Sequence, residues 1–566
     1  MDHAAGVKIR TRLVGGTLMS QMIEIDTQNH EDIEWLPHLT NEVVADARGP
    51  EFAAYVIALE GWRRGLTLKW HVKDSEYFKD MKTWSVDKPG KLFSLSSEDK
   101  THYFFRSRGD KVTNVAVDLA SDKGVSKQIL IKAGISTPAG KAFKEDIKDN
   151  TVIEYAKEIG FPVVIKPTDG SYGRGVITNI ENERELEQAL THLRKVQGYK
   201  DVLLEQHVPG DEYRVYVVSD KVVGVIKRIP ANVIGDGVNT VRSLIATKNK
   251  EKVKNPRLIT CLINVDQVMI DHIQKQGYTL DSVLVNGEHV YLNGISNISK
   301  GGDPIGYTDE LPVEVKDLAV QALHAIPGLA HGAVDVIYDA SNPITEAAVL
   351  ELNPTAQIGG LLFPAEGKAS DIPAAIIDHY FPETKNNKIP DKSRFYYDFM
   401  DNLSPLIDKT VRNTTVTPFP EGTIYAKKYT IKGDVQQIGY HRGLRKQAFE
   451  RFLHGFVLKR SNGDIEVVVS GNDAEMVDDF EKGIWEDPER SEVKEVISRT
   501  YEGPIKVGFE IKLDIQRKEE ELEKLRQELE HVQFDLKQAE KQHRNYKESS
   551  SWRLTSPIRV LGKLFK

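Results

Sequence analysis

Cysteine is almost absent from this chain, since Cys261 is the only one among its 566 residues. A single cysteine excludes an intrachain disulfide and a cysteine-based zinc site, and it favours a reducing compartment. Apolar runs of about eighteen residues, long enough to cross a membrane, are also missing, and the first residues lack the pattern of a secretory signal. We therefore expect a cytoplasmic protein.

A strong excess of charge of one sign is missing as well. The chain carries 76 Lys and Arg against 84 Asp and Glu, which gives a net charge of -8. This mildly acidic balance argues against a broad basic face, so we expect no nucleic-acid partner. An apolar fraction of 40% and a charged fraction of 28% are typical of globular domains. Because 566 residues exceed what one hydrophobic core organises, we expect several domains.

The apolar pattern predicts a small first unit. Residues 1–22 are polar and featureless, and we expect a disordered tail there. Residues 23–115 contain apolar residues at helical spacing over 50–66, followed by the strand-like run LTLKWHV. This combination predicts a small α/β unit.

The middle of the chain mixes strands and helices. Residues 116–382 alternate β-branched runs such as VVIKP and DVLLEQHV (201–208) with amphipathic stretches such as 183–194. The polar sequence ETKNNKIPDKSR opens a predicted linker over 383–420, and another short α/β pattern fills 421–511. The expected fold class is multidomain α/β and α+β.

The pattern changes after residue 511. Apolar residues recur at spacings of three and four, apart from a skipped position at Lys518, and they are Ile515, Leu522, Leu525, Leu529, Val532, Leu536 and Ala539. This pattern predicts a coiled-coil helix over 512–546 that joins copies of the chain into a homo-oligomer; a single long surface helix is the alternative. Residues 547–566 form a basic amphipathic tail, and its segment 549–566 predicts contact with a membrane surface or a protein. A disordered solubilising tail is the alternative.

Two lysines and a glycine-rich loop offer what a triphosphate requires. Lys123 and Lys166 supply cations, and the segment DGSYGRG at 169–175 allows backbone amides to approach phosphate oxygens. The candidate contacts in this loop are Gly170, Ser171, Gly173 and Gly175. Taken alone, the loop fits an ordinary hairpin turn equally well.

A segment thirty residues further on extends this nucleotide prediction. We expect the stretch from Glu205 to Val208 to form a hinge that reads adenine through backbone groups, and Glu212 to accept hydrogen bonds from ribose hydroxyls. Two solvated glutamates at a strand end are the alternative interpretation. Together with the lysines and the loop, the hinge predicts ATP as a cofactor.

Three oxygen-bearing side chains further along the chain predict a metal site. Asp335 lies in the strand-like HGAVDVIYD, and Glu351 and Asn353 lie two residues apart in VLELNPTAQIGG, hence on one strand face. Carboxylates and an amide oxygen, completed by water and phosphate oxygens, are the ligands that Mg²⁺ prefers. We therefore predict Mg²⁺, with Mn²⁺ as a substitute, although such residues by themselves are common on surfaces.

With these motifs in place, residues 111–382 resemble the ATP-grasp module of cyanophycin synthetase and of the bifunctional glutathione-synthesising ligases. Further similar stretches are PANVIGDGVNTVRSLI, TLDSVLVNGEHVYL and SNISKGGDPIGYTDE. The resemblance implies the ATP-grasp fold and a ligase that activates a carboxylate as an acyl phosphate and joins it to an amine. Small amino acids or peptides are the implied substrates.

The same resemblance implies roles for individual residues. Lys123 and Lys166 contact ATP phosphates, and Lys227 or Arg228 faces them. The GGD at 301–303 borders the acceptor or acyl phosphate pocket. Lys300 departs from the small hydroxyl residue of the relatives, and PTAQIGG at 354–360 departs from their usual sequence, so the sequence predicts no particular acceptor.

Residues 421–511 resemble acylphosphatase, which implies a small ferredoxin-like domain. The resemblance is carried by GDVQQIGYHRGLRKQAF, LHGFVLKRSNGDIEVVVSG and GPIKV. His441 stands where the family has its phosphate-binding arginine, and Lys459 where it has the asparagine that positions water. We therefore expect a domain that has lost hydrolysis. Acyl phosphate hydrolysis by this domain, and a non-catalytic ATP-binding scaffold, are the two alternatives to the ligase.

Overall fold

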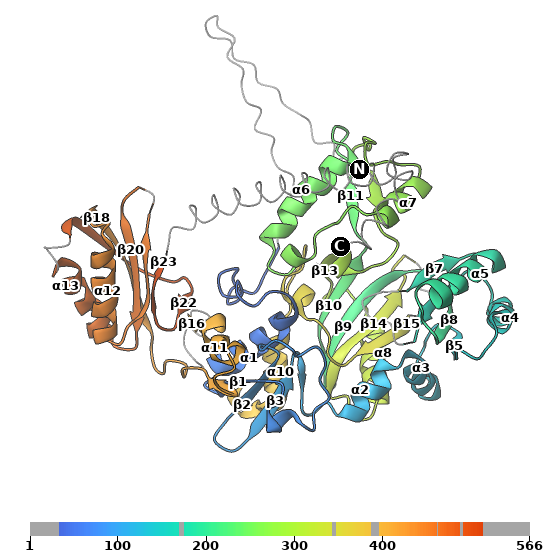
Figure 1. Cartoon of the computed structure of the whole chain (residues 1–566), viewed down its shortest axis with the longest axis horizontal. Helices are drawn as coiled ribbons and strands as arrows, with labels where there is room; N and C mark the ends of the chain where they lie inside the picture. Colours follow the sequence, from blue (N-terminus) through green and yellow to red (C-terminus); the bar gives the residue numbers. More distant parts are fainter. Residues whose placement is uncertain are drawn as a thin grey trace, which may run out of the picture.

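The computed structural model describes residues 33–168, 175–341, 347–385, 395–460, 462–486 and 491–512. The chain forms an N-terminal unit, a central region with two larger sheets and a smaller lobe, and a C-terminal domain that lies to one side (Figure 1). The tail predicted over 1–22, the coiled coil predicted over 512–546 beyond Lys512, and the tail predicted over 547–566 fall outside the described residues.

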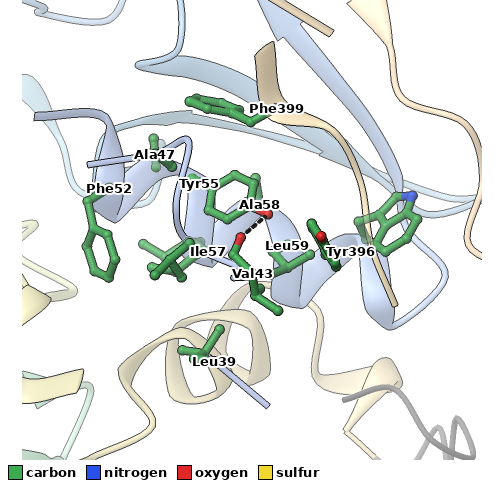
Figure 2. Packing of buried hydrophobic residues seen from close by; sticks show 14 of the residues in the cluster. Leu39, Val43, Ala47, Phe52, Tyr55, Ile57, Ala58, Leu59, Tyr396 and Phe399 are labelled. Atoms are coloured by element: carbon green, nitrogen blue, oxygen red, sulfur yellow. Dashed lines mark hydrogen bonds between the residues drawn. The ribbon is translucent and has the colours of Figure 1, made fainter. Parts of the chain in front are cut away.

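The N-terminal unit is built around one buried helix, α1 (Phe52–Arg63). Its sequence FAAYVIALEGWR is apolar nearly all round, and all twelve residues are buried. The Tyr55 hydroxyl donates a hydrogen bond of 2.8 Å to the Val43 carbonyl, and Phe399 packs beside it (Figure 2). The helix predicted over 50–66 is confirmed with shorter bounds, since Gly65 just beyond its end takes a positive φ of 85°.

A five-stranded antiparallel sheet completes this unit. Its order is β17-β1-β2-β3-β4. The strands are β1 (Thr67–His71), β2 (Leu92–Ser96), β3 (Thr101–Phe105), β4 (Arg108–Gly109) and β17 (Asn413–Thr415).

The linker predicted over 383–420 is wrong from residue 395 onward. Strand β16 (Phe395–Tyr396), helix α11 (Phe399–Ile407) and β17 return to the N-terminal unit, where Thr415 pairs with Lys69 of β1. The Phe399 ring lies 5.1 Å from the Trp70 ring. The polar residues before position 395 suggested a linker, but the aromatic run FYYDF that follows needs burial and finds it here.

The first part of the central region is a four-stranded antiparallel sheet of order β5-β8-β6-β7. The strands are β5 (Gly140–Phe143), β6 (Val163–Pro167), β7 (Ile177–Ile180) and β8 (Val202–Gln206). Helices α4 (Asp149–Ile159) and α5 (Glu183–Thr191) pack on it and share one hydrophobic cluster with its strands. The runs predicted at VVIKP, 183–194 and 201–208 thus form the expected kinds of element.

The second part is a five-stranded antiparallel sheet of order β13-β10-β9-β14-β15. The strands are β9 (Asp211–Val218), β10 (Lys221–Ile229), β13 (Asp303–Gly306), β14 (His331–Tyr338) and β15 (Ala348–Asn353). Helices α2 (Asn114–Ser121) and α8 (Val313–Ala325) cover one face, where Tyr213, Val215 and Val217 of β9 are buried. Side chains alternate along a strand, so Glu212 and Arg214 lie on the opposite face.

Helix α3 (Lys123–Lys132) and a smaller lobe complete the central region. The lobe pairs β11 (Asn232–Ile234) with β12 (His289–Tyr291) and carries α6 (Val241–Lys254) and α7 (Gln267–Lys275). Helices α9 (Gly359–Leu362) and α10 (Ile372–Tyr380) follow β15, and α10 packs against α1.

The C-terminal domain has the ferredoxin-like order β-α-β-β-α-β, with a further strand at one edge. Its elements are β18 (Tyr425–Asp434), α12 (Ile438–Glu450), β19 (His454–Lys459), β20 (Ile465–Gly471), α13 (Ala474–Trp485), β21 (Glu492–Thr500), β22 (Ile505–Lys506) and β23 (Phe509–Lys512). The sheet order is β21-β18-β20-β19-β23.

One hydrophobic cluster joins this domain to the N-terminal unit. Phe456 and Val468 belong to the same cluster as Trp62 and Phe395. Strand β22 also pairs with β16 in parallel, with Phe395 opposite Ile505. In the described part of the chain, no helix has both the length and the apolar character needed to span a bilayer.

Candidate nucleotide and metal site

Asp335 is the centre of the candidate site and is fully buried on β14. The guanidinium of Arg214 binds it in a bidentate manner, with Nε and Nη2 each 2.9 Å from a carboxylate oxygen. Arg228 Nη2 donates a third hydrogen bond, also of 2.9 Å, to Oδ2. Burial alone would raise the pKa of Asp335, but the charges of Arg214 and Arg228 hold it well below its usual range.

Glu351 and Asn353 lie beside Asp335 on the neighbouring strand. Glu351 is directly opposite Asp335 in the register of β14 and β15. Asn353 Nδ2 is 3.3 Å from Asp335 Oδ2 and 3.3 Å from Glu351 Oε1. The three predicted metal ligands therefore converge.

These three side chains fit a Mg²⁺ ion. Two carboxylates and an amide are the donors that Mg²⁺ takes from proteins, with water and phosphate oxygens completing its shell. Asp335 Oδ1 accepts only one of the hydrogen bonds described above, which leaves this oxygen a further lone pair. A rotation of the Asn353 amide would turn its oxygen toward the two carboxylates.

Arg228 has unused donor capacity at the site. Its Nη2 contacts Glu212 as well as Asp335. Its Nε is buried and finds no hydrogen-bond partner among the residues that the structure describes. A buried guanidinium with an unused donor is suited to an anionic ligand.

Helix α3 connects the two sheets of the central region through two lysines. Lys123 Nζ lies 3.6 Å from Glu351 Oε2 of the five-stranded sheet. One helical turn later, Lys127 Nζ lies 2.7 Å from Glu205 Oε1 of the four-stranded sheet. Residues four apart share a helix face, so one face of α3 carries both cations.

Glu205 holds a second lysine as well. Lys166 Nζ of β6 lies 2.5 Å from Glu205 Oε2, and the Glu205 side chain is only 4% exposed. Burial favours the neutral carboxyl, but Lys166 and Lys127 outweigh it and lower the pKa of Glu205. Burial also lowers the pKa of Lys127, against the opposing effect of Glu205. The result is a compact cluster of two cations around one buried anion.

The segment after Glu205 crosses from one sheet to the other. The backbone N–H groups of Gln206 and His207 already donate to Ala139 and Pro162 carbonyls, at 2.7 and 2.9 Å. Val208 N–H makes no such backbone bond within the described ranges. This leaves one backbone donor of the hinge for a ligand.

Not every predicted residue reaches the site. Lys227 pairs with Tyr213 across the sheet and thus lies on the face opposite to Arg228, where its Nζ is 2.6 Å from Asp211 Oδ2. Strand alternation accordingly separates the two neighbours, which the resemblance left as alternatives. Gly170, Ser171 and Gly173 fall outside the described residues. Gly175 is described and has a φ of 73°, which favours glycine.

Sequence reasoning missed Arg214 and Lys127. Arg214 lies two residues after Glu212, and a strand period of two would have placed both on one face. Lys127 lies four residues after Lys123, the spacing of one helix face. Their carboxylate partners are distant in sequence, so only the folded chain identifies them.

The C-terminal domain holds the other predicted pair. His441 is buried on α12 and its Nε2 lies 3.2 Å from the Val435 carbonyl, to which it donates. Burial lowers the pKa of His441, the hydrogen bond to Val435 opposes this effect, and the charge of Lys459 lowers the pKa further. Both side chains therefore lie in one region, and burial favours the neutral form of His441.

Comparisons with known proteins match the central region and the C-terminal domain to two different families. The family model of the RimK-like ATP-grasp domain matches residues 120–273, and that of acylphosphatase matches residues 427–511. Cyanophycin synthetase of Geminocystis herdmanii is 32% identical over 294 residues, or 50% of this chain and 32% of that protein. The glutathione biosynthesis bifunctional protein GshAB of Desulfotalea psychrophila is 30% identical over 298 residues, or 52% of this chain and 38% of that protein.

The chain thus spans about a third of the length of these curated relatives. Among solved structures, the bifunctional glutathione synthetase from Pasteurella multocida is 28% identical, with a TM-score of 0.40 and coverage of 52% of this chain and 41% of that chain. The ATP-grasp model covers the chain from the end of α2 into α7, including the hinge, and the acylphosphatase model covers the small domain from Lys427 to Ile511. The chain therefore combines a RimK-like ATP-grasp domain with an acylphosphatase-like domain.

Proposed function

We propose that this chain is an ATP- and Mg²⁺-dependent ligase that joins a carboxylate to the amine of an amino acid or peptide, by way of an acyl phosphate. The observation that carries this proposal is the convergence of Asp335, Glu351 and Asn353 with Lys123 and Arg228. An oxygen cluster for a cation thus lies on one face of the five-stranded sheet, beside Arg228 of the same sheet and Lys123 of α3 as basic groups for phosphates. The similarity to cyanophycin synthetase and GshAB supports this reaction class.

In this proposal, ATP lies between the two sheets that α3 connects. Lys123, Lys166 and Arg228 bind the phosphates, and the sequence motif assigns Gly170, Ser171, Gly173 and Gly175 to the same role. Val208 N–H and the Glu205 carbonyl bind adenine, and Glu212 accepts from the ribose. Because Arg228 also contacts Glu212 and Asp335, nucleotide binding would redistribute the hydrogen bonds of this guanidinium.

The reaction is balanced without a protein nucleophile. A substrate carboxylate oxygen attacks the γ-phosphorus of ATP, the bond to the β-phosphate oxygen breaks, and ADP leaves. The amine nitrogen then attacks the acyl carbon, phosphate leaves, and the nitrogen loses a proton. Bound Mg²⁺ would neutralise charge that develops on the phosphate oxygens. Lys123, Lys166 and Arg228 would orient the phosphates and stabilise the same charge.

ADP release tests this proposal directly. The full chain is incubated with MgATP and pools of amino acids or short peptides, and ADP is measured with and without each pool. Glu351→Ala should abolish substrate-dependent ADP release, whereas Glu314→Ala, an acidic residue of α8, should leave it unchanged. Transfer of ¹⁸O from the labelled substrate carboxylate to phosphate would support the acyl phosphate. Absence of substrate-dependent ADP from every pool would instead favour a non-catalytic ATP-binding scaffold.

We also propose that the acylphosphatase-like domain has lost hydrolysis. A buried His441 whose neutral form is favoured cannot replace a phosphate-binding arginine. Lys459 carries an ammonium group where the family has an asparagine amide, and an ammonium group can donate hydrogen bonds to a water molecule but cannot accept them. The full chain should therefore hydrolyse acetyl phosphate no faster than a His441→Ala variant does. Faster hydrolysis by the unaltered chain would instead favour an active acylphosphatase.

For the residues beyond 512, the sequence pattern supports a cytoplasmic homo-oligomer formed through 512–546, with 549–566 contacting an anionic membrane or a protein. Sedimentation should give more than one subunit per particle for the full chain and a smaller number of subunits for a chain that ends at Lys512. Flotation with anionic vesicles should differ between the full chain and one that lacks 549–566. Equal behaviour in each comparison would contradict these two assignments.

A further inference from the structure

A small pocket lies where the N-terminal unit meets the loop after β15. Pro50 and Phe52 line it from the N-terminal unit, together with Arg106, and Gln357 and Arg257 line it from the central region. None of these five residues belongs to the nucleotide and metal site described above. The pocket is therefore a feature separate from that site.

Arg106 is held in this pocket at a conformational cost. It lies in the turn between β3 and β4 with a positive φ of 56°, a conformation that is uncommon for residues other than glycine. Its backbone N–H donates to the Lys91 carbonyl at 2.9 Å, and this bond helps to keep the turn in place. Backbone strain of this kind is often retained where function requires it.

The Arg106 guanidinium has no counter-charge among the residues that the structure describes. Its Nε is buried without a hydrogen-bond partner, and no carboxylate of the described residues forms an ion pair with it. The side chain is only partly exposed. A partly buried cation in this state stabilises the protein little and is suited to an anionic ligand.

Arg257 enters the same pocket from the loop after α6. Its Nη2 donates to Gln357 Oε1 at 2.9 Å, and its Nη1 lies 2.9 Å from Cys261 Sγ. Its aliphatic stem packs on Gly359, where an added Cβ would come within 2.5 Å of Arg257 Cδ. All its partners are neutral, so two guanidinium groups share one pocket without a carboxylate from the described part of the chain.

The pocket begins next to the predicted metal ligands. Thr355, which lines it, follows Asn353 by two residues, so their Cα atoms are at most about 7 Å apart. The Ser107 hydroxyl donates a 2.7 Å hydrogen bond to the Ala356 carbonyl and anchors this loop to the turn that carries Arg106. The loop that lines the pocket thus directly follows the strand that carries Glu351 and Asn353.

We propose that Arg106 and Arg257 bind a substrate carboxylate that does not react, and that the substrates of this ligase therefore include an amino acid or peptide with such a carboxylate. The inference rests on the proposed ligase function. Arginine fits a carboxylate because its planar donors form paired hydrogen bonds. A phosphate is less suited to this place, because Lys123, Lys166 and Arg228 already provide cations for the triphosphate.

Thermal unfolding of the full chain tests the pocket without a known substrate. Glutarate serves as the carboxylate probe and glutaramide as its uncharged counterpart, at constant ionic strength and with Mg²⁺ and a non-hydrolysable ATP analogue present. Glutarate should raise the midpoint of the unaltered chain, whereas glutaramide should not. Arg106→Gln and Arg257→Gln should each lose this shift. Arg242→Gln, which changes an exposed arginine of α6, should keep it.

The variants also separate binding from folding. Since no carboxylate in the described ranges pairs with Arg106, Arg106→Gln should unfold at the same or a higher temperature without glutarate. In the ADP assay, either variant should raise the half-saturating concentration of the active pool at least about tenfold, the loss expected for a hydrogen-bonded charge.

Three results would overturn the proposal. The first is the absence of a glutarate shift in the unaltered chain. The second is a glutarate shift in both variants that equals the shift of the unaltered chain. The third is a shift with inorganic phosphate that exceeds the shift with glutarate. A shift with the ATP analogue but none with glutarate would refute the pocket alone. Absence of a shift with the ATP analogue as well would refute the nucleotide site and, with it, the ligase.

Discussion

The buried cluster of Lys127, Lys166 and Glu205 provides the sharpest test of how the site is held together. Glu205→Gln keeps the size of the side chain and removes only its charge. Lys127 and Lys166 are 4% and 10% exposed, so both would remain as buried cations without an anion. We expect the four-stranded sheet and α3 to become much less stable while the C-terminal domain is unaffected.

The expected magnitude follows from this burial. Removing one partner of a buried ion pair costs about 3–5 kcal/mol, because the remaining charge stays desolvated. Since 1.36 kcal/mol is a tenfold change, local opening should become roughly two to three and a half orders of magnitude more frequent. The loss is a large fraction of the roughly 5–15 kcal/mol that stabilises a typical domain.

The same cluster predicts a change in pH dependence. The pKa of Glu205 is lowered in the folded chain, so its stabilising effect is present above the unfolded value of 4.5 and is lost as the pH falls through the folded value. Glu205→Gln should lack this acid loss. Burial lowers the pKa of Lys127, so the stability of the variant should rise with pH toward the unfolded lysine value of 10.5.

Hydrogen exchange read by mass spectrometry is the appropriate assay, because a chain of several domains does not unfold in one step. Peptides that cover β6 and β8 report on the cluster, and peptides of α12 serve as the internal reference. Glu154→Gln is the matched control, since Glu154 is 72% exposed and pairs with Lys157 on the surface of the same region. If hydrogen exchange in the peptides of β6 and β8 becomes less than tenfold faster in Glu205→Gln, the reasoning is refuted.

Three further predictions concern other parts of the chain. Asp303→Asn should lower the thermal midpoint at pH 7 and remove an acid-dependent loss of stability, because burial would raise the pKa of Asp303 but neighbouring lysines lower it; an unchanged midpoint would contradict this. Gly210→Ala should weaken the thermal shift with an ATP analogue, since its Cβ would lie 2.8 Å from the backbone of β14 at a φ of 135°, whereas Gly294→Ala, whose Cβ would come no nearer than 3.4 Å to another atom, should not. The double change His441→Arg with Lys459→Asn should increase acetyl phosphate hydrolysis, and no increase would show that other differences account for the loss.

The sequence alone predicted much of the fold, because local patterns carry it. The apolar run around Phe52 to Arg63 could be buried only as an inner helix, and β-branched runs such as VVIKP predicted strands. The prediction of a linker over 383–420 was wrong from residue 395 onward, because composition describes a segment but does not show which other residues it packs against. The aromatic run beginning at Phe395 packs on Tyr55 and Trp70, more than three hundred positions earlier in the chain.

Residue types and short spacings determined which side chains could form the site. The spacing of two between Glu351 and Asn353 placed them on one face, and the quoted motifs identified Lys123 and Lys166 as candidates. The shared face of Glu351 and Asn353 follows from strand periodicity, which acts over a few residues. Asp335 was named from its motif and Arg228 from the resemblance, but Arg214 and the pairing of both arginines with Asp335 were not predicted.

Only the tertiary structure decided how these residues are paired. Strand register set Arg214 and Arg228 on Asp335 and sent Lys227 to the other face. The packing of α3 between two sheets joined Lys127 to Glu205, and the meeting of two units brought Arg106 to Arg257. All these contacts join residues that are far apart in sequence. At Asp335 and Glu205 the favourable interaction is compensation of buried charge, which exists only once the chain has folded around these groups.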